Sequence, residues 1–392
     1  MPEFIAPGVY VEELPVEMKP IEGVPTSTTA FVGTTSLGPV NSPVTVTSYV
    51  EYERTFGPLA ASCEMGYVVR AFFDNGGRKA VIVRVKGAGT FPRTTELIGS
   101  RKKKTGLYAL EKVKGFGLLC LPPVKPGGDT SWSIYRAALG YCKQRRALVL
   151  VDSPASWGIQ PLEGTSRAMA GLTQSRLAST DGAENAALSF PRIIQADPLQ
   201  NGQPRVTVAC GAIAGVMARI DTTRGVSKAP VGLDATLNDV LGLQYSLSTS
   251  ENDLLNPAGI NCVRPMSGRY VVWGGRTLST NNEWKYIPVR RLALFVEASI
   301  ENGILWASFE QNGEPLWTKL RALVESFLQN MWKQGVLQGT KPDEAYFVKC
   351  DRSTMTQGDI EKGLITVLVG VAPLRPTEFV LLRIQTKTAV PA

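Results

Sequence analysis

Ala147-Leu148-Val149-Leu150-Val151-Asp152 is the stretch that decides the fold, because its first five residues leave no polar side to face water. Two similar runs precede it, Ala80-Val81-Ile82-Val83-Arg84-Val85 and Leu118-Leu119-Cys120-Leu121. A segment with helical spacing precedes the first run, at residues 63–73, and another lies between the last two, at residues 132–144. Apolar strands that alternate with helices are typical of a parallel sheet covered on both faces. The sequence therefore predicts an α/β domain over residues 21–254.

The pattern changes after residue 254. Residues 260–264 and 270–274 are expected to form neighbouring strands. Two amphipathic helices follow, at 288–302 and 315–334, each with Pro in its first turn and Gly at its end. Further strands are expected at 345–349, 364–371 and 378–385. This order predicts a second, α+β domain over residues 255–385, so that the chain as a whole is α+β.

Both ends of the chain have the composition of extended segments. Near the start, Pro7-Gly8-Val9-Tyr10-Val11-Glu12-Glu13 alternates small or apolar with polar and aromatic residues, and Pro7, Pro15 and Pro20 oppose a helix. Residues 386–392 are polar and end in Val-Pro-Ala. We expect extended arms at 1–20 and 386–392, whose unpaired backbone must join a sheet of their own chain or of another.

Composition excludes several function classes. The chain has 392 residues, 44% of them hydrophobic, a formal charge of +8, and no histidine. His-dependent triads are excluded, and the six scattered cysteines, with no Cys-x-x-Cys pair, do not form the usual zinc ligand sets. We expect these cysteines to be buried and reduced, and we expect no catalytic residue, metal or cofactor.

Targeting signals are also missing from the sequence. The start Met-Pro-Glu-Phe lacks a basic region and an apolar core, so it is not expected to be a secretory signal. No run of about 18 apolar residues occurs, and a membrane span is not expected. Synthesis in the cytoplasm is the default expectation.

Two motifs leave other functions open. Arg101-Lys102-Lys103-Lys104 suits a nucleic-acid-binding protein, but no aromatic residue interleaves the charges and a solvated loop is favoured. Asp152 ends an apolar strand, as the magnesium-binding Asp of a nucleotide-using α/β enzyme would. That enzyme needs a phosphate loop, and no Gly-x-x-x-x-Gly-Lys-Ser/Thr occurs, so a turn residue is favoured.

Several collinear stretches resemble the tail sheath proteins of contractile phage tails and of phage-tail-like contractile injection systems, including pyocin-like and extracellular particles. The similar stretches span nearly the whole chain. They are Pro7–Glu13, Ile21–Ser27, Leu119–Pro123, Ala212–Lys228, Arg269–Leu278, Glu314–Trp317, Cys350–Asp351 with Thr354–Gln357, and Val369–Val380.

The resemblance implies a structural protein rather than an enzyme. Members of this family form a helical stack of rings around an inner tube, and the extended sheath contracts and drives the tube through a target envelope. It also implies baseplate and tail-terminator proteins as partners, no direct nucleic-acid contact and no membrane insertion. Assembly in the bacterial cytoplasm, with possible release of the particle, is the implied location.

The resemblance also assigns roles to parts of this chain. Residues 21–254 would be an outer domain and residues 255–385 an inner domain that faces the tube. The arms would add strands to the inner domains of neighbouring subunits, and basic side chains would meet an acidic tube surface. The implied arm contacts are Val9, Tyr10, Val11, Glu12, Ile384, Gln385, Thr386 and Lys387. The implied tube-facing residues are Arg290, Arg291, Lys319, Arg321 and Lys333.

Overall fold

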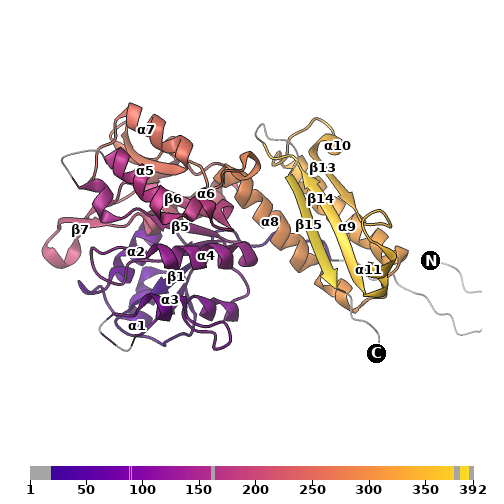
Figure 1. Ribbon diagram of the computed structural model, residues 1–392, viewed down its shortest axis with the longest axis horizontal. Coiled ribbons are helices and arrows are strands. Elements are labelled where there is room, and N and C mark those ends of the chain that lie inside the picture. Colours follow the sequence, from indigo (N-terminus) through magenta and orange to yellow (C-terminus); the bar gives the residue numbers. More distant parts are fainter. Residues whose placement is uncertain (1–18, 88, 90, 160–163, 375–379, 388–392) are drawn as a thin grey trace, which may run out of the picture.

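The computed structural model describes residues 19–87, 89, 91–159, 164–374 and 380–387, the last of these by their backbone only. The chain forms two lobes. A larger α/β lobe holds the first half of the sequence and more, and a smaller lobe holds the C-terminal part (Figure 1). The helix α8 (Ile287–Gly303) leads from the first lobe into the second.

The first lobe is built on a nine-stranded sheet with the order β2-β3-β1-β4-β5-β6-β11-β12-β9. The six strands from β3 to β11 in this order run parallel, while β2, β12 and β9 pair antiparallel. The predicted parallel sheet is therefore confirmed. The strands are β1 (Thr29–Gly33), β2 (Val44–Val46), β3 (Ala80–Arg84), β4 (Leu118–Cys120), β5 (Leu148–Asp152), β6 (Ala186–Phe190), β9 (Thr236–Leu237), β11 (Ile260–Met266) and β12 (Arg269–Val272).

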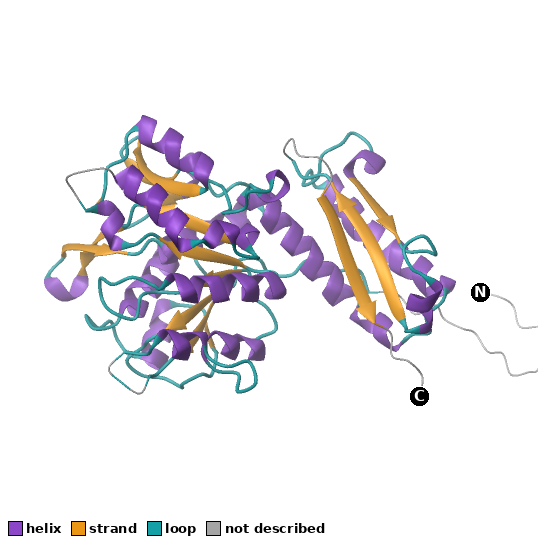
Figure 2. Ribbon diagram, viewed as in Figure 1, coloured by secondary structure: helices purple, strands orange, loops and turns teal. Residues whose placement is uncertain are grey.

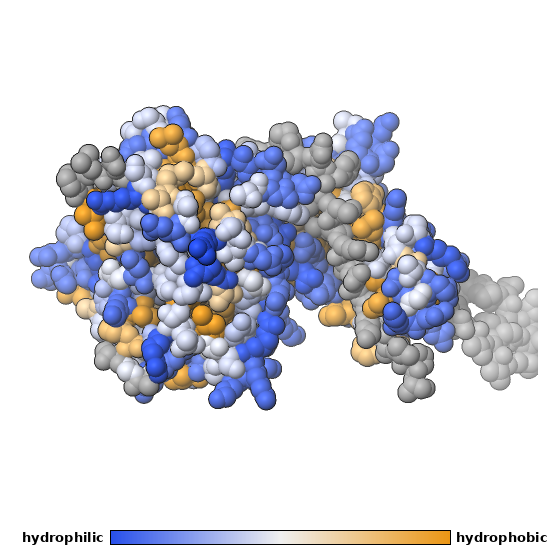
Figure 3. Space-filling view, viewed as in Figure 1, coloured by the Kyte–Doolittle hydropathy of each residue, from blue (hydrophilic) through white to orange (hydrophobic). Residues whose placement is uncertain are grey.

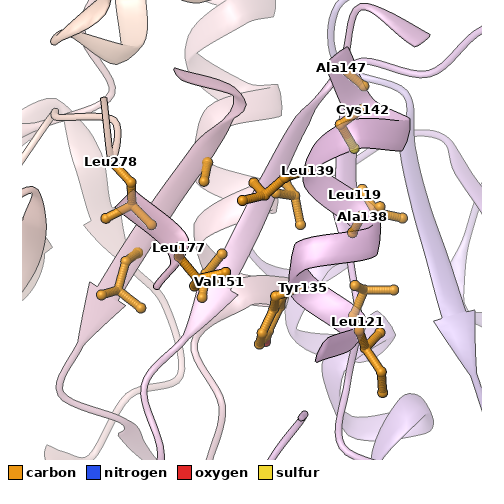
Figure 4. Packing of buried hydrophobic residues seen from close by; sticks show 14 of the residues in the cluster. Leu119, Leu121, Tyr135, Ala138, Leu139, Cys142, Ala147, Val151, Leu177 and Leu278 are labelled. Atoms are coloured by element: carbon orange, nitrogen blue, oxygen red, sulfur yellow. The ribbon is translucent and has the colours of Figure 1, made fainter. Parts of the chain in front are cut away.

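Helices cover both faces of this sheet, and the strands alternate between two buried cores. In β5, Val149 and Val151 point into one core, while Leu148 and Leu150 point into the other. Figure 4 shows Val151 and Leu119 against the first-core side of α4. The first core is covered by α3 (Thr94–Ile98), α4 (Trp132–Arg145) and α5 (Gly164–Ser175), and the second by α1 (Tyr49–Phe56), α2 (Glu64–Asp74) and α6 (Cys210–Arg224).

Smaller elements complete the first lobe. The strands β7 (Ile193–Asp197), β8 (Gln203–Thr207) and β10 (Gly242–Leu243) form a separate antiparallel sheet, and α7 (Thr249–Leu255) precedes β11. Short 3-10 helices lie at Gly106–Lys112, Ala155–Gly158, Leu177–Ser179, Ala183–Asn185, Pro198–Gln200, Gly232–Ala235, Asn256–Ala258, Asn282–Trp284 and Leu305–Phe309.

The second lobe has one antiparallel sheet with the order β13-β14-β15. Its strands lie in front of α9 in Figure 2, and the two long helices α8 and α9 share a third buried core with β14. The predicted pair of amphipathic helices is therefore confirmed. The elements are α9 (Glu314–Lys333), α10 (Pro342–Ala345), α11 (Gln357–Glu361), β13 (Tyr346–Lys349), β14 (Leu364–Val371) and β15 (Val380–Lys387).

The expected domain boundary between residues 254 and 255 is wrong, because the next two strands still belong to the first lobe. Both β11 and β12 belong to the nine-stranded sheet, where β11 pairs in parallel with β6. Ile260 and Cys262 are buried in the first core of that sheet. The strands look like the start of a new unit in sequence because they form a hairpin, but the hairpin completes the preceding sheet. The lobes meet at α8.

One segment of the described chain, Ile287–Phe309, is long and apolar enough to cross a membrane by length and composition. It consists of α8 and the short helix after it. The apolar side of α8 is buried in the third core, and Arg290 and Arg291 on its other side are buried as well. A core helix that packs against two lobes accounts for this composition.

Candidate functional site

Asp152 lies at the carboxyl end of β5 and binds the start of α6. Its Oδ1 accepts hydrogen bonds from the backbone N–H groups of Ala209 and Cys210, at 3.0 and 2.9 Å. Burial raises its pKa to about 6, against the lowering effects of these bonds and of Arg192. A helix N-terminus at this edge of a parallel sheet is where phosphate groups bind in many α/β proteins. Here the chain's own carboxylate occupies that position, which supports a structural role for Asp152.

The structure assigns no other chemical site in the described ranges. No group of three or more His, Cys, Asp or Glu side chains there is arranged to hold a metal ion. All six cysteines are free and buried, which confirms the expectation drawn from their apolar surroundings.

The basic run Arg101–Lys104 forms an exposed turn. Arg101 pairs with Glu111 at 3.0 Å, and its guanidinium lies 5.2 Å from the centre of the Tyr108 ring. The three lysines that follow are exposed. This arrangement agrees with a solvated loop that is fixed to the lobe through Arg101.

The expected arm contacts fall in two places. Val9, Tyr10, Val11 and Glu12 lie outside the described residues. Residues 384–387 belong to β15 and pair with Val367, Thr366, Ile365 and Leu364 of β14 in the same chain. The expected start of a C-terminal arm at residue 386 is therefore wrong, because the strand and its backbone pairing continue to Lys387.

The sheet of the second lobe ends in an open edge. In the part of the chain that the structure describes, the eight-residue strand β15 pairs only with β14, so its other side carries unpaired backbone groups. The short helix Leu305–Phe309 packs beside β15. Within it, Phe309 is 87% exposed and Leu305 is also exposed. The lobe therefore presents an unpaired strand next to exposed apolar side chains.

Arg290 and Arg291 were expected on a tube-facing surface, and the structure contradicts this. Arg291 is 4% exposed and binds Asp221 through two hydrogen bonds of 2.7 and 2.6 Å. Arg290 donates to Asn185 and lies 4.6 Å from the Trp284 ring centre. Both side chains face the first lobe, because the opposite side of α8 fills the third core.

The three basic residues of α9 do not share one side of the helix. Lys319 and Lys333 are exposed, and their spacing of 14 residues places them on one flank, about 21 Å apart along the helix axis. Arg321 lies near the opposite flank, beside Asp351, whose pKa it helps to lower after the larger effect of hydrogen bonds from Ser353. In the described residues, none of the three basic side chains forms an ion pair.

Sequence reasoning missed the polar contacts that join the lobes. Arg146 lies at the end of α4 and contacts Glu297 and Glu301 of α8. Asp221 pairs with Arg291 and accepts a hydrogen bond from Thr26. Asp221 falls in a stretch that resembles the sheath family, which marks it as notable, but its partners are distant in sequence.

Comparison with known proteins covers both lobes. Residues 279–387 match the family described as the phage tail sheath C-terminal domain. Over 281 residues the chain is 26% identical to a putative prophage major tail sheath protein of Pseudomonas aeruginosa (strain UCBPP-PA14), which spans 68% of this chain and 67% of that protein.

Solved structures agree over nearly the whole length. A chain of the anti-feeding prophage baseplate is 28% identical, with a TM-score of 0.72 over 96% of this chain and 98% of that chain. A chain of the contracted sheath complex of PVC, an extracellular contractile injection system, is 26% identical, with a TM-score of 0.75 over 97% and 98%. Residues 279–387 thus carry the phage tail sheath C-terminal domain, and the whole chain is similar to sheath and baseplate chains of contractile injection systems and to a prophage tail sheath protein.

Proposed function

We propose that this chain is a structural subunit of a contractile tail sheath, which polymerises around an inner tube and contracts from a metastable extended state to drive the tube through a target envelope. The similarity to sheath proteins supports this role. The relatives include a sheath complex and a helical sheath in the contracted state, and baseplate chains. A filament of this kind needs a heterologous contact, in which two different surfaces of neighbouring copies meet, so that assembly continues beyond a dimer.

The open edge of β15 is the observation that carries the proposal. An edge strand of eight residues can accept a further strand through backbone hydrogen bonds, which is a common mode of protein association. Such a junction depends on local bonds only, so neighbouring subunits can turn relative to one another while it stays intact. A bound strand would also cover Phe309 and Leu305, which are exposed beside β15.

The N-terminal segment is our candidate for the added strand. Val9 and Val11 favour an extended chain, and Tyr10 and Glu12 alternate with them, which suits a strand with two different sides. Pro15 and Pro20 would stiffen the tether between this segment and β1. Residues after Lys387 provide a second, shorter segment of this kind.

The exposed flank of α9 is our candidate for the tube contact. Lys319 and Lys333 provide two cations that stay free of intramolecular ion pairs in the described chain. Contacts of exposed charges are individually weak, about 0.2–1 kcal/mol, and are screened by salt. They can therefore hold a tube through many copies and still release when the sheath contracts. Arg321 is a weaker candidate, because it lies beside Asp351.

The remaining parts of the proposal follow from the same role. The sheath would be assembled in the bacterial cytoplasm and would contact a baseplate, a tail terminator and the inner tube. The chain would have no catalytic activity, because contraction takes its energy from the difference between two packings of the subunits.

Truncation tests the strand-addition step. Deletion of residues 1–18, or of 388–392, is expected to leave the melting temperature of the purified subunit unchanged and to abolish long sheaths in negative-stain microscopy. Both cuts spare the eight backbone pairs of β14 and β15. A double Val9→Pro and Val11→Pro variant should fail in the same way, and Val9→Ile with Val11→Ile should assemble. Normal long sheaths from both truncations would refute the proposed junction.

Charge reversal tests the tube contact. Lys319→Glu with Lys333→Glu is expected to reduce co-sedimentation of the subunit with preformed tubes, more strongly at low salt than at high salt. The matched control, Lys102→Glu with Lys103→Glu, reverses two exposed lysines of the first lobe. Equal losses in the two variants would show that net charge, rather than this flank of α9, governs tube binding.

A further inference from the structure

The helix α8 has two different sides. Val289, Val296 and Ile300 are buried in the core of the second lobe. The side that faces the first lobe is charged, since it carries Arg290, Arg291, Glu297 and Glu301. The lobes are therefore joined through ions and hydrogen bonds as well as through apolar contacts, such as that of Ile287 with the second core.

Asp221 is the centre of one of these contacts. It receives both terminal nitrogens of Arg291 at 2.7 and 2.6 Å, and the hydroxyl of Thr26 at 2.6 Å. Arg291 donates a further bond to the backbone carbonyl of Thr26, at 3.2 Å. The side chains of Asp221 and Arg291 are each 4% exposed. A bidentate, buried arginine–carboxylate pair of this kind is strong and directional, and the loss of one partner leaves the other charged and buried.

Arg146 makes a second contact at another place on α8. It lies directly after α4 and forms ion pairs with Glu297 and Glu301, with its Nε 3.4 Å from Glu297. Glu297 also lies 3.8 Å from Arg290. The two contacts tie α8 to the ends of α6 and α4, which lie on opposite faces of the first sheet.

Residues 21–26 lie along α8, and the last of them, Thr26, contacts Asp221. Ile21 is buried against Gly303, where an added Cβ would come within 2.6 Å of the Ile21 side chain. Gly23 lies against Phe295, with 2.7 Å between a hypothetical Cβ and the ring. The backbone N–H of Val24 donates to Ser299 Oγ at 3.0 Å. We call residues 21–26 the strap.

Two clefts lie beside the strap. A cleft of about 850 Å³ is lined by the strap, by Arg145 and Arg146 of the first lobe, and by Leu294 and Leu305 of the second. A further cleft of about 360 Å³ is lined in part by Ile21 and Gly23. The strap is held by the burial of Ile21 and by the hydrogen bonds of Val24 and Thr26.

We infer that Asp221 is a latch that joins three segments, the strap, the end of α6 and α8, and so fixes the angle between the lobes and the point at which residues 1–18 leave the subunit. Each segment reaches Asp221 from a different part of the fold, and Arg291 and Thr26 also bond to each other. If residues 1–18 link neighbouring subunits, as proposed above, a pull on them acts on both lobes together. Only this last consequence depends on the proposed function.

Hydrogen–deuterium exchange of the unassembled, full-length chain tests the latch. Asp221→Asn is expected to accelerate exchange in residues 20–28, the Val24 amide included, by roughly 10- to 100-fold, the effect of losing hydrogen bonds to charged groups. Thr26→Val keeps the ion pair and is expected to give a smaller increase in the same residues. The control is Asp181→Asn, which removes an exposed carboxylate that pairs with Lys143. Exchange in β4 and β5 reports on the fold and should stay unchanged in all three variants.

Two results would overturn the inference. The first is equal exchange of residues 20–28 in the Asp221→Asn and Asp181→Asn variants. The second is a rise spread over both lobes in Asp221→Asn, with no change in Thr26→Val, since Asp221 would then support the core without holding the strap. Neither result depends on sheath assembly. A failed latch and a failed strand junction are therefore told apart, because the junction is read by microscopy and the latch by exchange in single subunits.

Discussion

The two sheets of this protein differ most at their edges. The nine-stranded sheet of the first lobe ends in β2, of three residues, and β9, of two residues. The three-stranded sheet of the second lobe ends in β15, of eight residues. Short edge strands prevent pairing with other chains, while a long edge strand invites it. The first sheet is finished within one chain, and the second is suited to extension by another.

The two sheets also differ in how far helices cover their faces. Helices cover both faces of the first sheet and one face of the second (Figures 1 and 2). On the side of the first lobe seen in Figure 3, hydrophobic residues form separate small patches among hydrophilic ones. We therefore propose that the second lobe, rather than the first, provides the surfaces for assembly.

The largest effect is expected at the centre of the closed sheet. Leu119 of β4 is fully buried, and Leu119→Ala should lower the free energy of unfolding by about 2–5 kcal/mol, through lost burial and the cavity that remains. Thr45→Ala, on the edge strand β2, should change it by less than about 0.5 kcal/mol. Chemical denaturation measures both. Similar losses at the two positions would contradict the expectation that the central strands contribute more to stability than the edge strand.

A pH-dependent effect is expected at the carboxyl edge of the same sheet. The pKa of Asp152 is raised from 3.8 to about 6, so the folded protein binds this proton more tightly than the unfolded chain. Stability should therefore rise as the pH falls from about 6 to about 4, by up to about 3 kcal/mol from this group. Asp152→Asn keeps an oxygen for the N–H groups of Ala209 and Cys210 and should remove this dependence. Identical pH profiles of the two proteins would rule out the buried, neutralisable carboxyl.

A smaller effect is expected in the open sheet. A Cβ on Gly370 of β14 would lie 2.1 Å from the Phe347 ring of β13, so Gly370→Ala must displace that ring. We expect a loss of about 1–3 kcal/mol, the usual cost of overpacking. In a protein that already carries Phe347→Ala, Gly370→Ala should lower the melting temperature less than it does in the unsubstituted protein. Full additivity of the two substitutions would show that the contact is not the cause.

The smallest effect is expected on the surface of the first lobe. Replacing Lys102, Lys103 and Lys104 with Ser should change stability by less than about 0.5 kcal/mol and leave sheath assembly unchanged, because these side chains are exposed in a turn. Electron microscopy and melting curves check both. Loss of assembly would show that the first lobe also contributes to the interface between subunits, which would contradict the proposed difference between the lobes.

Local patterns predicted most of the elements. The apolar runs at 80–85, 118–121 and 147–152 became parallel strands, and the helix expected at 288–302 is α8. The hairpin of β11 and β12 was expected in the wrong domain, because the pairing of β11 with β6 depends on residues about 70 positions earlier. A local pattern fixes the type of an element but contains no information about which sheet it joins.

Local hydrophobic periods predicted the type and order of most elements and the burial of the cysteines, while the collinear similar stretches indicated the resemblance to tail sheath proteins. The partners of the charged side chains, in contrast, depend on contacts between segments that are distant in sequence. Arg291 looked like a surface cation, but it bonds to Asp221 and to Thr26, which lies 265 residues away. Whether an arginine on a helix meets water, a partner or its own chain depends on what packs against that side of the helix, and this is set by contacts between distant segments.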